Sequence, residues 1–277
     1  MTGTKLPMGG ATVDAVNWEL YDRYFQVSPD FSPAAAFSVP VPGLMRPETM
    51  DEALERSRAA LRGWDLRIAA SFLGLAVFGL TATATALLSH HNLAADFTPE
   101  RLTFRLEPQG DHLRAAFRLS LSLRPVPAVD REAFVVRYLT DLHRTTITPL
   151  VEHIAQRAGV RPGLIWNQYG SRQIWVREFL AGNSPDDDCR RRVMADCEAL
   201  ERRLAPETFR LQKNPYTHAP QYIEDLYTEG KKTVLRSACC QWYRREGGVK
   251  CYTCPLLKPE EREAMRLRHR ERAQTQS

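Results

Sequence analysis

IAASFLGLAVFGLTATATALL, residues 68 to 88, is an apolar run without a charged residue, and its placement decides the fold. Its length meets the requirement for a membrane-spanning helix. Ala, Gly, Ser and Thr supply much of the run, however, so its hydrophobicity is modest. A single span with the basic flank at Arg62 and Arg67 inside would also place the cysteine-rich C-terminal segment outside the cytoplasm. We therefore predict a buried core helix, either a single one or two broken near Gly79, in preference to a membrane span.

Before this run, the sequence predicts two helices joined by a connector. Residues Trp18 to Phe25 have the spacing of a short amphipathic helix. Prolines then punctuate residues 29 to 47, which indicates an extended connector. Pro47 opens a helix that should run to about Arg62, because proline and early acidic residues suit a first helical turn.

After the run comes the best strand signal in the chain. Residues 102–106 and 112–123 alternate apolar and polar side chains around the turn Pro108-Gln109-Gly110-Asp111, which predicts a β-hairpin. Helical periodicity then covers residues 131–158 and 162–180, and Ser184 is expected to cap a third helix. The fold class is therefore α+β, mostly helical, with a central β-hairpin or small antiparallel sheet.

We divide the chain into three parts. Residues 1–60 hold the N-terminal helices and the Pro-rich connector, residues 61–230 form a body, and residues 231–277 hold a cysteine motif and a charged tail.

Charge and cysteine content limit the partners and the compartment. The 277 residues carry a formal net charge of +5, and no Lys/Arg-rich run is interleaved with aromatic residues, so we expect no nucleic acid partner. An anionic small ligand or peripheral association with a membrane surface would suit this charge. The N-terminal residues lack the apolar core of a secretory signal, which predicts a cytoplasmic protein. Clustered thiols in a reducing compartment are typical of metal ligands or redox groups.

Four of the six cysteines lie in RSACCQWYRREGGVKCYTCP, residues 236–255. Two are adjacent and two form a C-x-x-C turn, and the Gly-Gly pair between them permits a tight reversal. Thiolates bind both iron and zinc. Zinc sites usually use two separated knuckles, which adjacent cysteines fit poorly because successive side chains diverge. The common plant-type ferredoxin spacing is also absent. The spacing favours a two-iron cluster over zinc and leaves both open, with the same four ligands: Cys239, Cys240, Cys251 and Cys254.

The full pattern R-x-x-C-C-x-x-Y-R, Gly-Gly and C-x-x-C-P closely resembles the C-terminal signature of the FhuF-type ferric-siderophore reductases. A looser likeness extends from about Trp64 to Arg262. The resemblance implies that the four cysteines hold a [2Fe–2S] cluster. It also implies that the body binds a siderophore, is related to the C-terminal part of siderophore synthetases, and contains the apolar run as a soluble core helix. The expected function is that of a cytoplasmic oxidoreductase of iron uptake, which passes one electron to siderophore-bound Fe(III) and releases Fe(II).

Residues around the cysteines have predicted roles in this scheme. A cluster with four thiolate ligands is negative, so Arg236 or Arg244 should stabilise its reduced form and raise its potential. Tyr243 should pack against the cluster loop, and Arg245 and Lys250 are candidates for attracting an anionic siderophore. We nominate no catalytic residue beyond the cluster. No dinucleotide fingerprint is present, so a separate electron donor is expected.

Two rival readings remain. One is a binding protein without turnover, either a zinc-stapled domain or an iron–sulfur sensor. The other is a synthetase-like enzyme, which we disfavour because no Gly-rich phosphate loop is present. Outside the motif, we read Cys189 and Cys197 as structural, and His90 and His91 as a helix end. Aromatic packing is the preferred role of Trp166, Tyr169 and Trp175.

Overall fold

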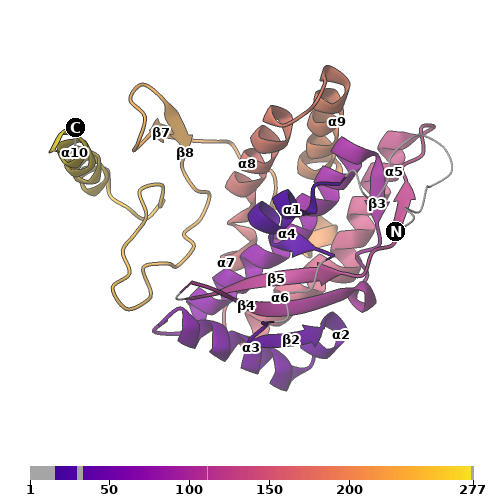
Figure 1. Cartoon of the computed structure of the whole chain (residues 1–277), viewed down its shortest axis with the longest axis horizontal. Helices are drawn as coiled ribbons and strands as arrows, with labels where there is room; N and C mark the ends of the chain where they lie inside the picture. Colours follow the sequence, from indigo (N-terminus) through magenta and orange to yellow (C-terminus); the bar gives the residue numbers. More distant parts are fainter. Residues whose placement is uncertain (1–15, 30–33, 111, 276–277) are drawn as a thin grey trace.

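The fold is organised around one long central helix. A computed structural model describes residues 16–29, 34–110 and 112–275, and the N-terminal residues 1–15 and Asp111 of the predicted turn lie outside this description. Helix α4 (Leu66–His91) runs through the middle of the body, with helices around it and a sheet on one side (Figure 1). The α+β class predicted from the sequence is confirmed.

Helix α4 is the predicted core helix, and it is a single helix. Asp65 caps its N-terminus by accepting a hydrogen bond from the Arg67 N–H at 3.0 Å, and left-handed Asn92 ends it. Within the described residues it is the one helix long and apolar enough to cross a membrane, and 89% of its most apolar window is buried inside the protein. Such burial is the pattern of a core helix, because a lipid-facing helix would expose its apolar side chains.

Gly79 does not break α4, and its role is to allow close packing. A Cβ atom at this position would lie 1.9 Å from the Phe25 carbonyl oxygen. Helix α1 (Trp18–Phe25) therefore rests directly on the backbone of α4 at Gly79. The glycine that suggested a break is explained by this contact.

The other helices pack around α4. Helix α3 (Pro47–Ala60) and helix α1 match the predicted ranges closely, whereas a short helix α2 (Val41–Leu44) was not predicted in the connector. The predicted helix over 131–158 is α5 (Arg131–Leu142), a π-helical turn (His143–Ile147) and α6 (Thr148–Arg157). The remaining helices are α7 (Gly163–Trp166), α8 (Tyr169–Gly182), α9 (Asp187–Glu198) with a π-helical end (Ala199–Arg203), short 3₁₀ turns (Pro99–Arg101, Pro206–Phe209) and α10 (Pro259–Thr275).

One cap was predicted wrongly. Asp186, not Ser184, caps α9, and its carboxylate accepts a hydrogen bond from the Cys189 N–H at 2.7 Å. The Ser184 hydroxyl instead donates to the Leu180 carbonyl oxygen at 2.9 Å, at the end of the preceding helix. Asp187 and Asp188 follow this cap in the first turn of α9, where acidic side chains suit the helix dipole.

The predicted hairpin is confirmed as β4 (Leu102–Gln109) and β5 (His112–Leu119), which pair antiparallel. They form a four-stranded sheet in the order β1-β5-β4-β2, with β1 (Val27–Ser28) and β2 (Phe37–Pro40) at its edges. The sheet is mixed, because α1 delivers β1 parallel to β5. The predicted central hairpin is antiparallel, and only the edge strand β1 makes the sheet mixed. Two smaller antiparallel pairs are β3 (Leu93–Ala95) with β6 (Leu123–Pro125) and β7 (Tyr222–Glu224) with β8 (Lys232–Val234).

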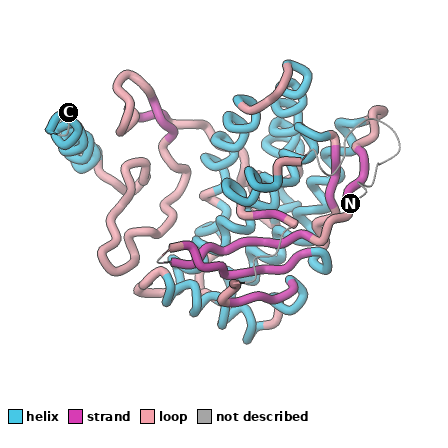
Figure 2. The backbone as a smooth tube through the Cα atoms, viewed as in Figure 1, coloured by secondary structure: helices cyan, strands magenta, loops and turns pink. Residues whose placement is uncertain are grey.

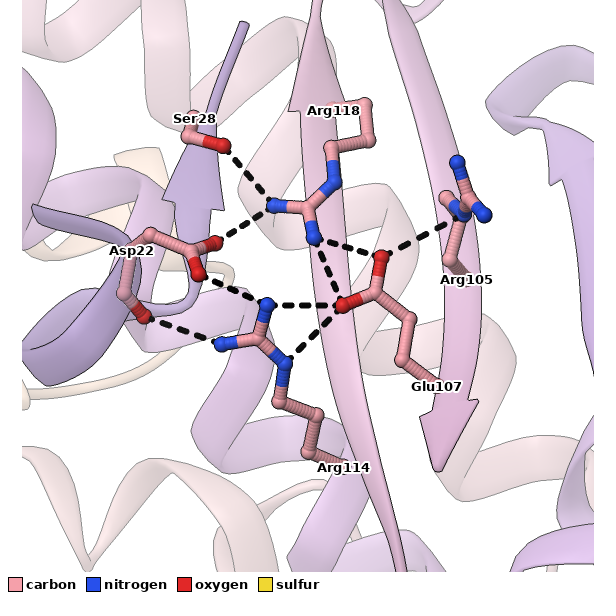
Figure 3. A network of polar contacts seen from close by, with 6 residues as sticks. All are labelled: Asp22, Ser28, Arg105, Glu107, Arg114 and Arg118. Carbon is pink, nitrogen blue, oxygen red and sulfur yellow. Dashed lines mark hydrogen bonds and ion pairs between the residues drawn. The ribbon is translucent and has the colours of Figure 1, made fainter. Parts of the chain in front are cut away.

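Charged side chains are buried where α1 meets the hairpin (Figure 3). Glu107 accepts hydrogen bonds from Arg118 at 2.6 Å and from Arg114 at 2.9 Å. Asp22 of α1 accepts another from Arg114 at 2.7 Å, and Arg118 also donates to Ser28 at 2.9 Å. Because each carboxylate faces guanidinium groups, the charges are compensated, and the network fixes α1 onto the polar face of the sheet.

The C-terminal part lies at one side of the body. Strands β7 and β8 and helix α10 lie beyond α8 (Figure 1), and residues 235–258 run between them as loops and turns (Figure 2). The cysteine motif falls entirely within these loops. Its position is set by contacts with the body.

Candidate iron–sulfur site

The cysteine segment docks on the residues that precede α4. A single β-bridge joins Arg245 to Gly63. On either side of it, the Trp64 N–H donates to the Arg244 carbonyl oxygen at 3.1 Å, and the Glu246 N–H donates to the Arg62 carbonyl oxygen at 3.0 Å. These backbone contacts hold the turn between the two cysteine pairs against the core.

Two serines make a second attachment. Ser71 of α4 donates its hydroxyl to the Cys240 carbonyl oxygen at 2.8 Å. Ser237 donates to the Asn167 carbonyl oxygen at 2.6 Å and accepts from the Ser171 N–H at 3.1 Å. The first cysteine pair is thereby fixed to α4 and to the junction of α7 and α8. Neither serine was singled out from the sequence, because only the folded chain brings Ser71 next to Cys240.

Arg244 has a different role from the predicted one. Its guanidinium pairs with Asp65, with Nε 3.1 Å from Oδ2, and Asp65 is the residue that caps α4. Within the described part of the chain, no hydrogen bond joins Arg244 to a cysteine sulfur. Charge complementarity with Asp65 accounts for this placement, and Arg244 is an anchor of the segment.

The four cysteine thiols lie as two pairs. The Sγ atoms of Cys239 and Cys254 are 3.5 Å apart, and the thiols of Cys240 and Cys251 are in hydrogen-bond contact. The adjacent cysteines thus diverge, and each meets one member of the C-x-x-C turn. Within the described residues, no three or more His, Cys, Asp or Glu side chains gather at the spacing of a single metal ion.

The Gly-Gly pair produces the reversal between the two halves of the motif. Gly247 adopts a φ of +64°, in the left-handed region that favours glycine. A Cβ atom on Gly248 would lie 2.7 Å from the Trp242 carbonyl oxygen. Both glycines are therefore required by the turn, as the sequence predicted.

Hydrogen-bond donors face the sulfurs. Arg236 donates from Nη1 to the Cys240 Sγ at 2.9 Å, and the Gln241 N–H donates to the Cys239 Sγ at 3.4 Å. The hydrogen bond from Cys251, helped by the Arg236 charge, lowers the pKa of Cys240, while burial raises the pKa of Cys239 to about 11. Donors of this kind stabilise thiolate ligands, so the site suits a metal–thiolate centre.

The pairing suits a two-iron cluster. A two-iron cluster takes two thiolates on each iron, and two pairs of sulfurs meet this need. A zinc ion needs all four sulfurs around one point. The four thiols therefore fit a two-iron cluster.

The comparison with protein families agrees. Residues 236–256 match the profile of a family described as FhuF 2Fe-2S C-terminal domain. The match supports the resemblance of this segment to the FhuF-type family and indicates a [2Fe–2S] cluster. No curated protein matches the chain.

The remaining predicted residues have local contacts. Tyr243 packs against the small apolar cluster of Cys239, Cys254 and Leu257. Arg245 lies over the Trp242 ring at 4.4 Å from its centroid, and Lys250 donates to the Leu256 carbonyl oxygen at 3.0 Å. Attraction of a siderophore by Arg245 and Lys250 stays a prediction.

The residues read as structural lie in the body. Cys189 and Cys197 are buried in α9, and burial raises the pKa of Cys197. His90 and His91 are the last residues of α4 and bond the Leu180 carbonyl and the Tyr21 hydroxyl. Trp166 and Tyr169 are buried core residues, whereas Trp175 is 41% exposed and lines a cavity described below.

Proposed function

We propose that this protein is a cytoplasmic ferric-siderophore reductase, which passes one electron to siderophore-bound Fe(III) and releases Fe(II). The observation that carries the proposal is the match of residues 236–256 to the FhuF 2Fe-2S C-terminal domain. The two thiol pairs and the donors facing them support it. Cys239, Cys240, Cys251 and Cys254 would hold the cluster, and a separate protein or small reductant would supply the electrons.

For this reaction the protein has only to hold the cluster close to the iron of the substrate. The cluster supplies one electron at a time. Siderophores bind Fe(III) through hard, anionic oxygens and bind the less charged Fe(II) far more weakly, so a one-electron reduction is sufficient for release. No proton transfer or nucleophile is required. The chain contributes a rigid mount, because the cysteine segment is attached to α4 through Arg244–Asp65 and Ser71.

The exposure of the cysteines suggests where the electron leaves. Cys239 and Cys254 are buried, whereas Cys240 and Cys251 are partly exposed. The substrate would therefore approach the side of Cys240 and Cys251. Arg236 holds the Cys240 sulfur on this side through its hydrogen bond.

A single-turnover reaction tests the proposal. Protein reduced with dithionite and freed of excess reductant is mixed without oxygen with a ferric siderophore, in the presence of an Fe(II) chromophoric chelator. We expect the visible absorption of the oxidised protein to return at the rate at which Fe(II) appears, with one Fe(II) per protein. A Cys189→Ser variant should behave like the wild type.

The alternative is a binding protein without turnover. An iron–sulfur sensor would hold the cluster but leave Fe(II) release no faster than in its absence, and a zinc-stapled domain would show no visible absorption. Either result would contradict the reductase proposal.

A further inference from the structure

A cavity of about 380 Å³ lies beside the cysteine segment. Its walls come from α8, from the β7–β8 hairpin and from the start and end of the cysteine motif, including Arg236 and Thr253. This volume lies within the usual range of small-molecule sites. The site is built from segments that are distant in the sequence, so the sequence alone does not reveal it.

The charges around the cavity are mainly positive. Arg172, Lys232 and Arg236 line it, and Glu178 is the one acidic side chain among its lining residues. Arg172 is partly buried, and within the described residues it makes no hydrogen bond or ion pair. Burial, together with the neighbouring Arg236 guanidinium, lowers the pKa of Arg172 to about 10. Arg236 already faces the Cys240 sulfur, whereas Arg172 has no carboxylate partner among the described residues and would be stabilised by a bound anion.

The cavity is connected to the cluster ligands through a single side chain. Arg236 lines the cavity and also donates a hydrogen bond to the Cys240 Sγ at 2.9 Å. A ligand in the cavity would therefore lie on the side of the partly exposed Cys240. Trp175 lines the same cavity and is 41% exposed, and its ring offers a flat apolar surface to an aromatic ligand.

We propose that this cavity binds the substrate as an anionic ferric chelate of the tris-catecholate class, through Arg172, Lys232 and Arg236. The inference rests on the proposed reductase function and specifies its substrate. One electron leaves the reduced protein and converts Fe(III) of the chelate to Fe(II), and the catecholate oxygens take up protons from water as Fe(II) dissociates. Cationic chelates are disfavoured, because the same side chains would repel them.

Binding can be tested without reduction. Gallium(III) has the charge and size of ferric iron but does not accept the electron, so calorimetric titration of the oxidised full-length protein measures binding alone. The two probes are the trianionic gallium tris-catecholate and a neutral gallium tris-hydroxamate. We expect the trianionic complex to bind more tightly, and Arg172→Gln and Lys232→Gln each to weaken it by about tenfold, with little effect on the neutral complex.

Matched variants keep the test selective. Lys231→Gln removes the adjacent lysine of the same hairpin, which is exposed and does not line the cavity, and should leave binding unchanged. Arg172→Lys should restore most of the affinity. Lys232 is exposed, so its variant is expected to fold even if Arg172→Gln does not. Equal binding of both probes, or wild-type affinity in both glutamine variants, would overturn the proposal.

The two proposals can fail separately. If Fe(II) release from ferric tris-catecholate is fast and unaffected by Arg172→Gln and Lys232→Gln, the reductase stands and this cavity is not its substrate site. If the gallium complex binds as expected but the reduced protein transfers its electron neither to the ferric tris-catecholate nor to a ferric tris-hydroxamate, the anion site stands and the reductase proposal fails.

Discussion

Arg236 and Arg244 lie in the same short segment, but their side chains have different partners. Arg236 donates to a cysteine sulfur, and Arg244 pairs with the carboxylate that caps α4. The sequence indicated that one of them would act on the cluster, because both are cations close to the cysteines. It could not indicate which one, because the choice depends on Asp65, which becomes a neighbour only in the folded chain.

This difference gives a prediction for the reduction potential. Arg236→Gln removes a charge-assisted donor from the Cys240 sulfur, so the reduced form loses more stabilisation than the oxidised form. We expect the midpoint potential to fall by roughly 60 mV, the equivalent of a tenfold change in a one-electron equilibrium. Arg244→Gln should leave the potential nearly unchanged and instead lower the thermal stability of the segment. Redox titration followed by visible absorption measures both, and equal shifts in the two variants would contradict these assignments.

His143 gives a prediction for the pH dependence of stability. It is buried in the π-helical turn, where Nδ1 bonds the Leu139 carbonyl at 2.6 Å and Nε2 bonds the Tyr216 hydroxyl at 2.8 Å. The carbonyl can only accept, so Nδ1 carries the proton and Nε2 accepts from the tyrosine. Burial lowers the pKa of His143 to about 4.

Its contribution to stability is therefore fully present above the unfolded pKa of about 6.5 and is lost as the pH falls toward 4. Between pH 7 and pH 5.5 we expect this residue alone to lower the free energy of unfolding by about 1 kcal/mol. Urea denaturation at the two pH values should show a smaller decrease in His143→Gln than in the wild type. The exposed His112→Gln serves as control, and an unaltered pH dependence in His143→Gln would argue against a buried neutral imidazole.

At the scale of elements, α4 is an example of a helix that the sequence pattern predicts. Its apolar run predicted a core helix, and the Asp65 cap and Asn92 end agree with ordinary helix signals. The hairpin and helices α1 and α3 could also be predicted from the sequence, because the periodicity of their own residues is sufficient to identify them. Strand β2 and helix α2 were hidden in the Pro-rich connector, because their burial depends on contacts with β4 and α3 rather than on their own pattern.

Gly79 provides the test of this packing. Gly79→Ala places a methyl group against the Phe25 carbonyl oxygen, which can be relieved only by moving α1 away from α4. We expect the free energy of unfolding to fall by about 3 kcal/mol. At Gly182, the last residue of α8, no atom beyond its chain neighbours and the backbone of its own helix lies within 4 Å of the added Cβ, so Gly182→Ala should change stability by no more than about 0.5 kcal/mol. Urea denaturation compares the two variants, and equal stabilities would show that α1 does not rest on Gly79.

At the scale of the whole molecule, the site is an assembly of distant parts. The C-terminal motif could be predicted from the sequence because its four cysteines all lie within residues 236–255. The family match covers the same segment. The attachment of the motif to Ser71 and Asp65 and the cavity with Arg172 could not be predicted from the sequence, because they join residues that are far apart along the chain. The buried network of Asp22, Glu107 and Arg118 escaped prediction for the same reason (Figure 3).

The central claim is that the four cysteines of the C-terminal segment hold a [2Fe–2S] cluster. Its most direct test is an absorption spectrum of protein purified without oxygen, with iron, sulfide and zinc assayed on the same sample. We predict visible bands that bleach with dithionite and about two irons and two sulfides per chain. The bands should be lost in Cys240→Ser and kept in Cys197→Ser. A colourless protein that contains one zinc, even after cluster reconstitution is attempted, would contradict the account.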